Sequence, residues 1–411
     1  MATIAQGSAR TEWGKHWPLV AATAMGMSLA ALLSAIFGVM LGPLEQEFGW
    51  TRAEISTGPA VVSVMGLFLA TPAGYLIDRF GARRCGVLVV VLTCIAIAAM
   101  SAIGNSLWHW WACWAVFGIS GAFTSTVWLA PVSTVFHAGR GMAIALTISG
   151  TGISMALAPG IAEYFIEHHG WRSGFLALSA IWGVMTMPLV LAFVPKNLSA
   201  SEQADARAEL PGLTPREGFR SANFYLLFLA SLVSAMTGVA LILNLVPVLT
   251  FTGLTRIDAV AIAGSMGVAS IIGRIVGGLL MDRFDVQRLA IGACVISLLF
   301  PLSLLIFPGL LWAGFLGVIA YGLTGGMKMN AIVYLTSTHL GARNFGVFYG
   351  TISITTTVAQ GIGPLVANHI YDVTHSYTPV MWAAIPGFIG AGVLFASLRP
   401  APHFALATPA E

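Results

Sequence analysis

Charged residues are scarce in this sequence. Asp, Glu, Lys and Arg make up 9% of the 411 residues, whereas 57% are hydrophobic. A soluble domain carries about 25% charged residues, so this chain has too few to cover a water-facing surface of its size. The net charge is only +3, and the composition therefore gives no sign of nucleic-acid binding.

Cysteine is also rare, and the sequence shows no set of metal ligands. The four cysteines fall inside apolar runs without the spacing of a metal site: Cys85, Cys94, Cys113 and Cys294. We therefore expect unpaired thiols, no metal and no cofactor. The nine histidines are scattered, so they form no recognisable catalytic group, and we do not expect an enzyme.

Long apolar runs take the place of the missing charges. About 20 helical residues span the hydrocarbon core of a bilayer, and the runs between polar breaks predict twelve transmembrane helices. They lie near 17–41, 53–77, 85–103, 108–136, 141–166, 173–194, 222–251, 257–281, 289–307, 311–338, 345–371 and 378–398. The fold class is thus an all-α polytopic membrane protein: a tail (1–16), a six-helix bundle (17–194), a hydrophilic linker (195–221), a second bundle (222–398) and a tail (399–411).

Lys and Arg are distributed unequally between the two sides of these spans. Fourteen fall in the two tails, the linker and the loops on their side, and three fall on the opposite side. Because cytoplasmic loops carry an excess of Lys and Arg, we expect both termini and the linker to be cytoplasmic. This predicts a multi-pass protein of the cell (inner) membrane, with the lipid bilayer as its surroundings.

A motif recurs in the two halves of the chain. Gly74-Tyr-Leu-Ile-Asp78-Arg79 follows the second predicted helix, and Gly278-Leu-Leu-Met-Asp282-Arg283 follows the eighth, with the glycines 204 residues apart. Pro159 in the fifth helix and Pro364 in the eleventh are 205 residues apart. Two matches at nearly the same offset predict that the halves are structural repeats, as in transporters whose site lies between two bundles.

The first copy continues to Arg83 and Arg84, and it resembles the cytoplasmic loop signature of the major facilitator superfamily. That resemblance implies two pseudo-symmetric six-helix bundles. We expect the glycine to let two helices approach closely, and the charged residues to latch one conformation. The expected gating residues are Gly74, Asp78, Arg79, Arg83, Asp282 and Arg283. For Arg83, anchoring of a helix end is the alternative, and the second copy departs from the pattern at Asp285, where glycine is expected.

Three further segments resemble the branch of monocarboxylate transporters and oxalate/formate exchangers. They are the run from Phe136 to Gly152, the run from Phe37 to Glu54 with its Phe48-Gly49-Trp50-Thr51-Arg52, and the pair Gly273-Arg274. The resemblance implies that Arg274 binds the carboxylate of a substrate. The sequence departs from the branch in lacking the acidic-Gly-aromatic-Trp motif of animal members, and in having no Lys or Arg from Gly346 to Gly363.

Two cations lie deep inside predicted helices. Arg274 is about 12 Å from Asp282, and Lys328 about 16 Å from His339, at the helical rise of about 1.5 Å per residue. Such a cation at the bilayer centre costs about 2.5–3.5 kcal/mol on insertion scales. Fifteen of the sixteen acids lie near span ends or outside the spans, and Glu163 is the deepest. Both cations are therefore predicted to bind an anion, although Lys328 could instead bond helix carbonyls near Gly325-Gly326 or be neutral.

Other polar or aromatic residues lie at a similar depth, and for each one taken alone a helix-packing contact is favoured over a contact with the ligand. The candidates for substrate binding are Asn244, Gln360, Ser270, Trp128 and Phe37. The amides are favoured because an amide in hydrocarbon needs a partner.

The sequence favours secondary transport of a small organic carboxylate, by a carrier expected to be a monomer. The preferred mode is anion/proton symport, with His369, Lys328 or the bound substrate taking the proton. A dicarboxylate or oxalate/formate-type exchanger is the alternative. A drug efflux pump is disfavoured because 108–136 contains neither arginine nor acid. A sensor is disfavoured because the 27-residue linker has no room for a signalling domain.

Overall fold

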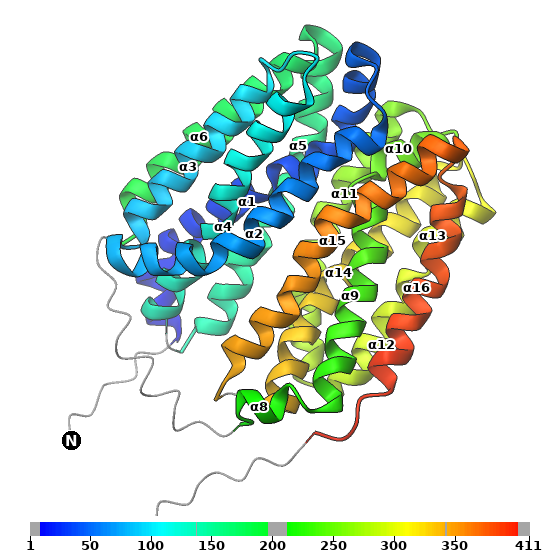
Figure 1. Cartoon of the computed structure of the whole chain (residues 1–411). Helices are drawn as coiled ribbons and strands as arrows, with labels where there is room; N and C mark the ends of the chain where they lie inside the picture. Colours follow the sequence, from blue (N-terminus) through cyan, green and yellow to red (C-terminus); the bar gives the residue numbers. More distant parts are fainter. Residues whose placement is uncertain (1–8, 137, 196–211, 342, 402–411) are drawn as a thin grey trace, which may run out of the picture. The chain divides into compact units, whose positions relative to one another are not determined.

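The computed structural model describes residues 9–136, 138–195, 212–341 and 343–401, and these are almost entirely α-helical (Figure 1). Most of the predicted linker, residues 196–211, lies outside this part of the chain. The described chain divides into two compact units. Unit 1 is Met1–Trp50 with Thr57–Leu198, and unit 2 is Thr51–Ser56 with Ser199–Glu411.

Most helix bounds agree closely with the predicted spans, but the first helix starts at Ala9 and ends at Phe48, beyond the predicted 17–41 at both ends. Those before the linker are α1 (Ala9–Phe48), α2 (Arg52–Phe80), α3 (Ala82–Met100), α4 (Leu107–Val135), α5 (Arg140–His169) and α6 (Trp171–Phe193). Those after it are α8 (Pro215–Gly218), α9 (Ala222–Ile242), α10 (Leu245–Phe251), α11 (Arg256–Met281), α12 (Val286–Ser297), α13 (Leu299–Ile306), α14 (Leu311–Leu340), α15 (Phe345–Thr374) and α16 (Thr378–Ala396).

Two of the predicted spans are interrupted. One divides into α9 and α10, and the other into α12 and α13. Pro247 and Pro301 lie just after these breaks. Each proline lacks an N–H and its ring clashes with the carbonyl four residues earlier. The helices therefore break at Leu243-Asn244 and at Leu298.

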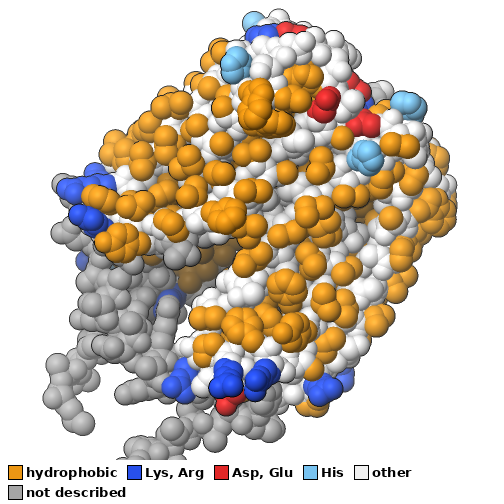
Figure 2. All heavy atoms as spheres, viewed as in Figure 1, with side chains coloured by type: hydrophobic (Ala, Val, Ile, Leu, Met, Phe, Trp, Pro, Cys, Tyr) orange, Lys and Arg blue, Asp and Glu red, His pale blue; other side chains and the backbone are white. Residues whose placement is uncertain are grey.

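Nine helical stretches in the described part of the chain are long and apolar enough to cross a membrane. Hydrophobic side chains cover much of the face shown in Figure 2, and Lys and Arg side chains gather near the margins of that view. A water-facing surface would not leave so much apolar area exposed. The prediction of an all-α, multi-pass membrane protein is confirmed.

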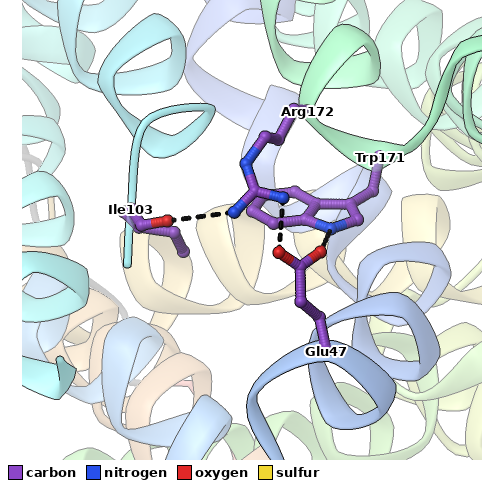
Figure 3. Close-up of polar contacts among 4 residues, drawn as sticks. All are labelled: Glu47, Ile103, Trp171 and Arg172. Atoms are coloured by element: carbon purple, nitrogen blue, oxygen red, sulfur yellow. Dashed lines mark hydrogen bonds and ion pairs between the residues drawn. The ribbon is translucent and has the colours of Figure 1, made fainter. Parts of the chain in front are cut away.

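Unit 1 is packed through close helix contacts. In the α1–α5 pair, a Cβ added to Gly150 would lie 1.9 Å from the carbonyl oxygen of Ala24, so only glycine fits. At the far end of α1, the carboxylate of Glu47 pairs with Arg172 and accepts the indole N–H of Trp171 (Figure 3). Arg172 also donates to the carbonyl of Ile103 at 3.4 Å. These contacts join α1, α6 and the loop after α3.

Unit 2 has its most extensive helix contact between α11 and α14. A Cβ on Gly273 would lie 2.1 Å from the carbonyl oxygen of Leu323, and one on Gly326 would lie 2.5 Å from that of Ser270. The two backbones therefore touch, because a side chain on either glycine would separate them. Helix α9 packs against α15 and α16, and α12 packs against α14 and α16.

Buried hydroxyl pairs repeat between the two units. Thr93 bonds Ser120 in unit 1, and Ser297 bonds Thr324 in unit 2, each at 2.9 Å and each 27 residues apart. A second set joins Thr23 to Thr147 and Ser231 to Thr355, each 124 residues apart. In the first set, each residue of the unit 1 pair lies 204 residues before its counterpart in unit 2. In the second set, this separation is 208 residues for both counterparts. These bonds support the internal repeat that the motifs predicted.

Candidate functional site

Arg274 lies in the last third of α11, eight residues before Asp282 at the end of that helix. Its backbone and the start of its side chain rest against Gly326 of α14, where an added Cβ would come within 3.0 Å of them. The carbonyl of Arg274 accepts a hydrogen bond of 2.9 Å from the amide of Asn330. Glycine packing and this bond therefore fix the arginine against α14.

A second helix contributes aromatic and hydroxyl groups near Arg274. The phenol of Tyr349, on α15, lies in the neighbourhood of the guanidinium and is bonded to Ser353. Tyr349 stacks on Phe345 with the ring centroids 5.3 Å apart. Sequence reasoning missed Tyr349, although it lies in the first turns of a predicted span. A guanidinium near a phenol can hold a carboxylate through two parallel N–H bonds, with the hydroxyl as an additional donor.

Lys328 lies in a different environment, 5% exposed in the core of unit 2. Its ammonium donates to the hydroxyl of Ser297 on α12 at 3.0 Å. The same nitrogen lies 5.0 Å from the ring centroid of Tyr321 and 4.9 Å from that of Phe388 on α16. Both distances are within the range of cation–π attraction, about 6 Å. A hydroxyl and two aromatic faces thus surround this cation.

The two cations occupy opposite faces of α14. Gly326 faces α11 and Arg274, whereas Lys328, two residues later, is turned by about 200° at 3.6 residues per turn. It accordingly contacts α12 and α16. The structure therefore does not bring Lys328 to the face that Arg274 occupies, and its contact with an anion stays a prediction.

The remaining substrate candidates are dispersed. Ser270 is one turn from Arg274 on α11, and its carbonyl faces Gly326. Asn244 is fully buried and accepts a bond from Asn368. Gln360 of α15 is exposed, as is His369 of the same helix, the candidate for proton coupling. In unit 1, Trp128 is fully buried against Gly26, and Phe37 packs on Trp114. Within unit 2, Ser270 is the substrate candidate that shares a helix with Arg274 and lies one turn from it.

The predicted gating residues are only partly described. Arg79, Asp282 and Arg283 are exposed, and Arg83 donates to the carbonyl of Leu191 in α6. The side chain of Asp78 lies outside the described residues. A Cβ added to Gly74 or Gly278 would meet nothing within 4 Å, so the close approach expected at this motif is not present there. It occurs instead at Gly273 and Gly326.

Acidic groups are distant from the middle of the helices in unit 2. Those that the structure describes lie at or within a turn of a helix end: Glu54, Glu217, Asp258, Asp282, Asp285 and Asp372. No cluster of three or more His, Cys, Asp or Glu side chains suited to a metal is found among the described residues. The charge that Arg274 places inside α11, two turns from its end, is positive, which suits an anionic ligand.

Comparison with known proteins identifies what the chain resembles. The family model described as Major Facilitator Superfamily matches residues 23–364. Monocarboxylate transporter 13 of Bos taurus is 24% identical over 95% of this chain and 90% of its own length. The tetracenomycin C resistance and export protein of Streptomyces glaucescens is 28% identical, over 48% of this chain and 35% of its own length. The resemblance to monocarboxylate transporters predicted from the motifs is confirmed at this low identity.

A solved structure supports the fold. It is the crystal structure of a bacterial homologue of the human lysosomal transporter Spinster, in an inward-facing and unoccupied conformation. The two chains share 15% identity with a TM-score of 0.64, over 92% of this chain and 94% of the other. At that identity the likeness concerns the arrangement of helices, and it confirms the predicted two-bundle, twelve-helix architecture.

Proposed function

Because the chain belongs to the major facilitator superfamily, we propose that it is a secondary transporter of small organic carboxylates in which Arg274 binds the carboxylate. The observation that carries the proposal is a guanidinium held in the apolar body of α11 by Gly326, with the phenol of Tyr349 in its neighbourhood. Its charge is far from the acids of unit 2, which lie near helix ends. The similarity to monocarboxylate transporters supports the same class of substrate.

Lys328 enters the proposal in a different way from Arg274. Its hydroxyl and aromatic partners stabilise the cation without a ligand, so we assign it to the core of unit 2 and leave the first contact with the anion to Arg274. Ser270, Gln360, Asn244, Phe37 and Trp128 remain candidates for further contacts. Among these, Ser270 is favoured by its position one turn from Arg274.

Transport by alternating access would follow from the family's two-bundle design. The excess of Lys and Arg on one side supports cytoplasmic termini and linker, in a cell (inner) membrane. We propose anion/proton symport by a monomer. Exchange of oxalate- or formate-type anions is the second mode, supported by the motifs shared with that branch. Export of a drug is supported only by a relative that matches about half of this chain.

The test is uptake into proteoliposomes that contain the purified protein. The panel would include radiolabelled lactate, pyruvate, benzoate, oxalate, formate, glucose and a cationic drug. The proposal expects saturable uptake of at least one carboxylate, and competition by unlabelled carboxylates only. Uptake of glucose or of the cationic drug, with no carboxylate transported, would show that the proposal is wrong.

A further inference from the structure

The first turn of α2 is bound by residues at the far end of the sequence. Residues 51–56 belong to unit 2, whereas the rest of α2 belongs to unit 1. The carboxylate of Asp372, near the end of α15, accepts the backbone N–H of Arg52 at 3.2 Å and that of Ala53 at 2.8 Å. A carboxylate at these two amides is favoured by the partial positive charge at a helix N-terminus.

The side chain of Arg52 makes separate contacts with the same region. Its guanidinium carbon lies 3.9 Å from the centroid of the Tyr371 ring, and its Nη1 donates to the hydroxyl of Tyr377 at 3.1 Å. Stacking of a guanidinium on an aromatic face combines with the hydrogen bond to fix its position. Both the backbone and the side chain of Arg52 are thus held.

A buried amide network continues from this point. The Tyr377 hydroxyl donates to Asn368 Oδ1 at 2.8 Å. Asn368 Nδ2 donates to Ser56 Oγ at 2.6 Å and to Asn244 Oδ1 at 2.8 Å, which uses both of its hydrogens. Ser56, Asn244, Asn368 and Tyr377 are all 0% exposed. If residues 51–56 moved away, Asn368 would lose its bond to Ser56 and Tyr377 its bond to Arg52, and leaving a buried polar group without such a partner is costly.

These contacts exceed what the helix needs in order to begin. Thr51 and Glu54 already form a local capping box, in which each side chain bonds the other residue's backbone N–H. In the corresponding turn of α11, Thr255 accepts the N–H of Asp258 in the same local manner. Asp372 is therefore an additional cap on α2, supplied from 320 residues away.

We infer that Arg52, Ser56, Asn368, Tyr371, Asp372 and Tyr377 form a latch that stabilises one conformational state of the carrier. Because α2 begins in unit 2 and continues in unit 1, a change in the relation between the units must act on these bonds. The inference assigns a role to the Phe48–Glu54 motif that the substrate site does not use. It rests on the chain being an alternating-access transporter, and it holds whichever substrate is carried.

The test combines amide exchange with a distance measurement on the full chain in nanodiscs. Hydrogen exchange of the peptide that contains residues 51–56 is compared between the native protein, Asp372→Asn and Arg52→Gln. Spin labels are placed at Trp108→Cys and Ile257→Cys, which are 76% and 68% exposed. Cys85, Cys94, Cys113 and Cys294 are replaced beforehand. The matched control is Glu47→Gln, which removes an ion pair that lies wholly within unit 1 (Figure 3).

We expect Asp372→Asn to speed exchange in residues 51–56 about tenfold and to shift the ratio of the two distance populations by a similar factor, because two charge-assisted bonds are weakened. Asp372→Glu should shift both less, and Glu47→Gln should shift neither. If exchange rises while the distances stay unchanged, the contact is only a helix cap and the latch is wrong. Equal effects of Glu47→Gln and Asp372→Asn would also overturn it. Neither measurement requires the substrate, so the result is independent of the carboxylate proposal.

Discussion

Arginine and lysine bind a carboxylate in different ways. The planar guanidinium offers two parallel N–H bonds, whereas the ammonium is a compact point charge. In the sequence, Arg274 and Lys328 look equivalent because depth is found by counting residues from a helix end. In the structure they differ in their surroundings. The surroundings of each cation depend on which face of α14 packs on α11. The backbone contacts of Gly326 determine that face, and counting residues from a helix end does not reveal it.

Substitution of Arg274 tests its role directly. Arg274→Gln keeps a polar but shorter side chain and removes the charge, so we expect carboxylate affinity to fall at least about tenfold, since charged hydrogen bonds contribute about 1.5–3 kcal/mol. Arg274→Lys should recover little of this loss, because the planar fork is absent. Calorimetric titration of the purified variants with the transported carboxylate measures the change. Arg288→Gln, which removes an exposed arginine of α12, is the control. Normal affinity in Arg274→Gln would rule out the anion site.

The substitution Lys328→Met tests whether Lys328 is a residue of the core or a contact of the bound anion. Methionine keeps the length and apolar stem but loses the bond to Ser297 and the attraction to both rings. Replacing a buried charge with an apolar group of similar volume is often neutral for stability. We therefore expect a folded protein whose carboxylate affinity changes by less than about twofold. An affinity loss as large as that of Arg274→Gln would mean instead that Lys328 contacts the anion, as the sequence alone suggested.

At the scale of helices, the length of each apolar run in the sequence predicted where each helix lies, because a segment that crosses lipid must be apolar along its length. The bounds of α2, α11 and α14 each lie within three residues of the prediction. The contacts between helices were less predictable. The repeated motif pointed to Gly74 and Gly278, yet the close backbone contacts are at Gly273 and Gly326. A glycine shows that a close approach is possible, and only the facing helix shows whether it occurs.

Two glycines five residues apart on α11 provide a matched test of helix packing. Gly273→Ala would place a Cβ 2.1 Å from the carbonyl oxygen of Leu323, so the two helices must separate. Forced overpacking costs about 1–3 kcal/mol, and we expect a lower melting temperature in detergent. Gly278→Ala would point into open space and should leave the melting temperature unchanged or raise it, since alanine favours the helix. A Gly273→Ala protein as stable as Gly278→Ala would contradict the close α11–α14 contact.

At the scale of the whole molecule, the positions of the acids limit how the carrier can be coupled, because those that the structure describes in unit 2 lie near helix ends. An empty site with a cation inside a membrane span is costly to move through the hydrocarbon midplane, and a bound carboxylate offsets that cost. Both an obligate exchanger and an anion/proton symporter satisfy this condition. The similarity to monocarboxylate transporters favours the symporter. The proton would then be carried by the substrate or by a group such as His369, which is exposed on α15.

A proton gradient imposed on proteoliposomes distinguishes the two modes. With no substrate inside, an acidic exterior should drive accumulation of a labelled monocarboxylate, and a protonophore should abolish the accumulation, because the gradient supplies the free energy. An exchanger would instead need internal counter-substrate and would ignore the pH difference, in which case the symport proposal is wrong. The variant His369→Gln tests whether the transported proton is carried by this histidine. If the histidine carries it, this variant should lose gradient-driven accumulation but keep exchange of labelled for unlabelled substrate. If accumulation persists, the proton travels with the carboxylate, since the anion neutralises Arg274 in either case.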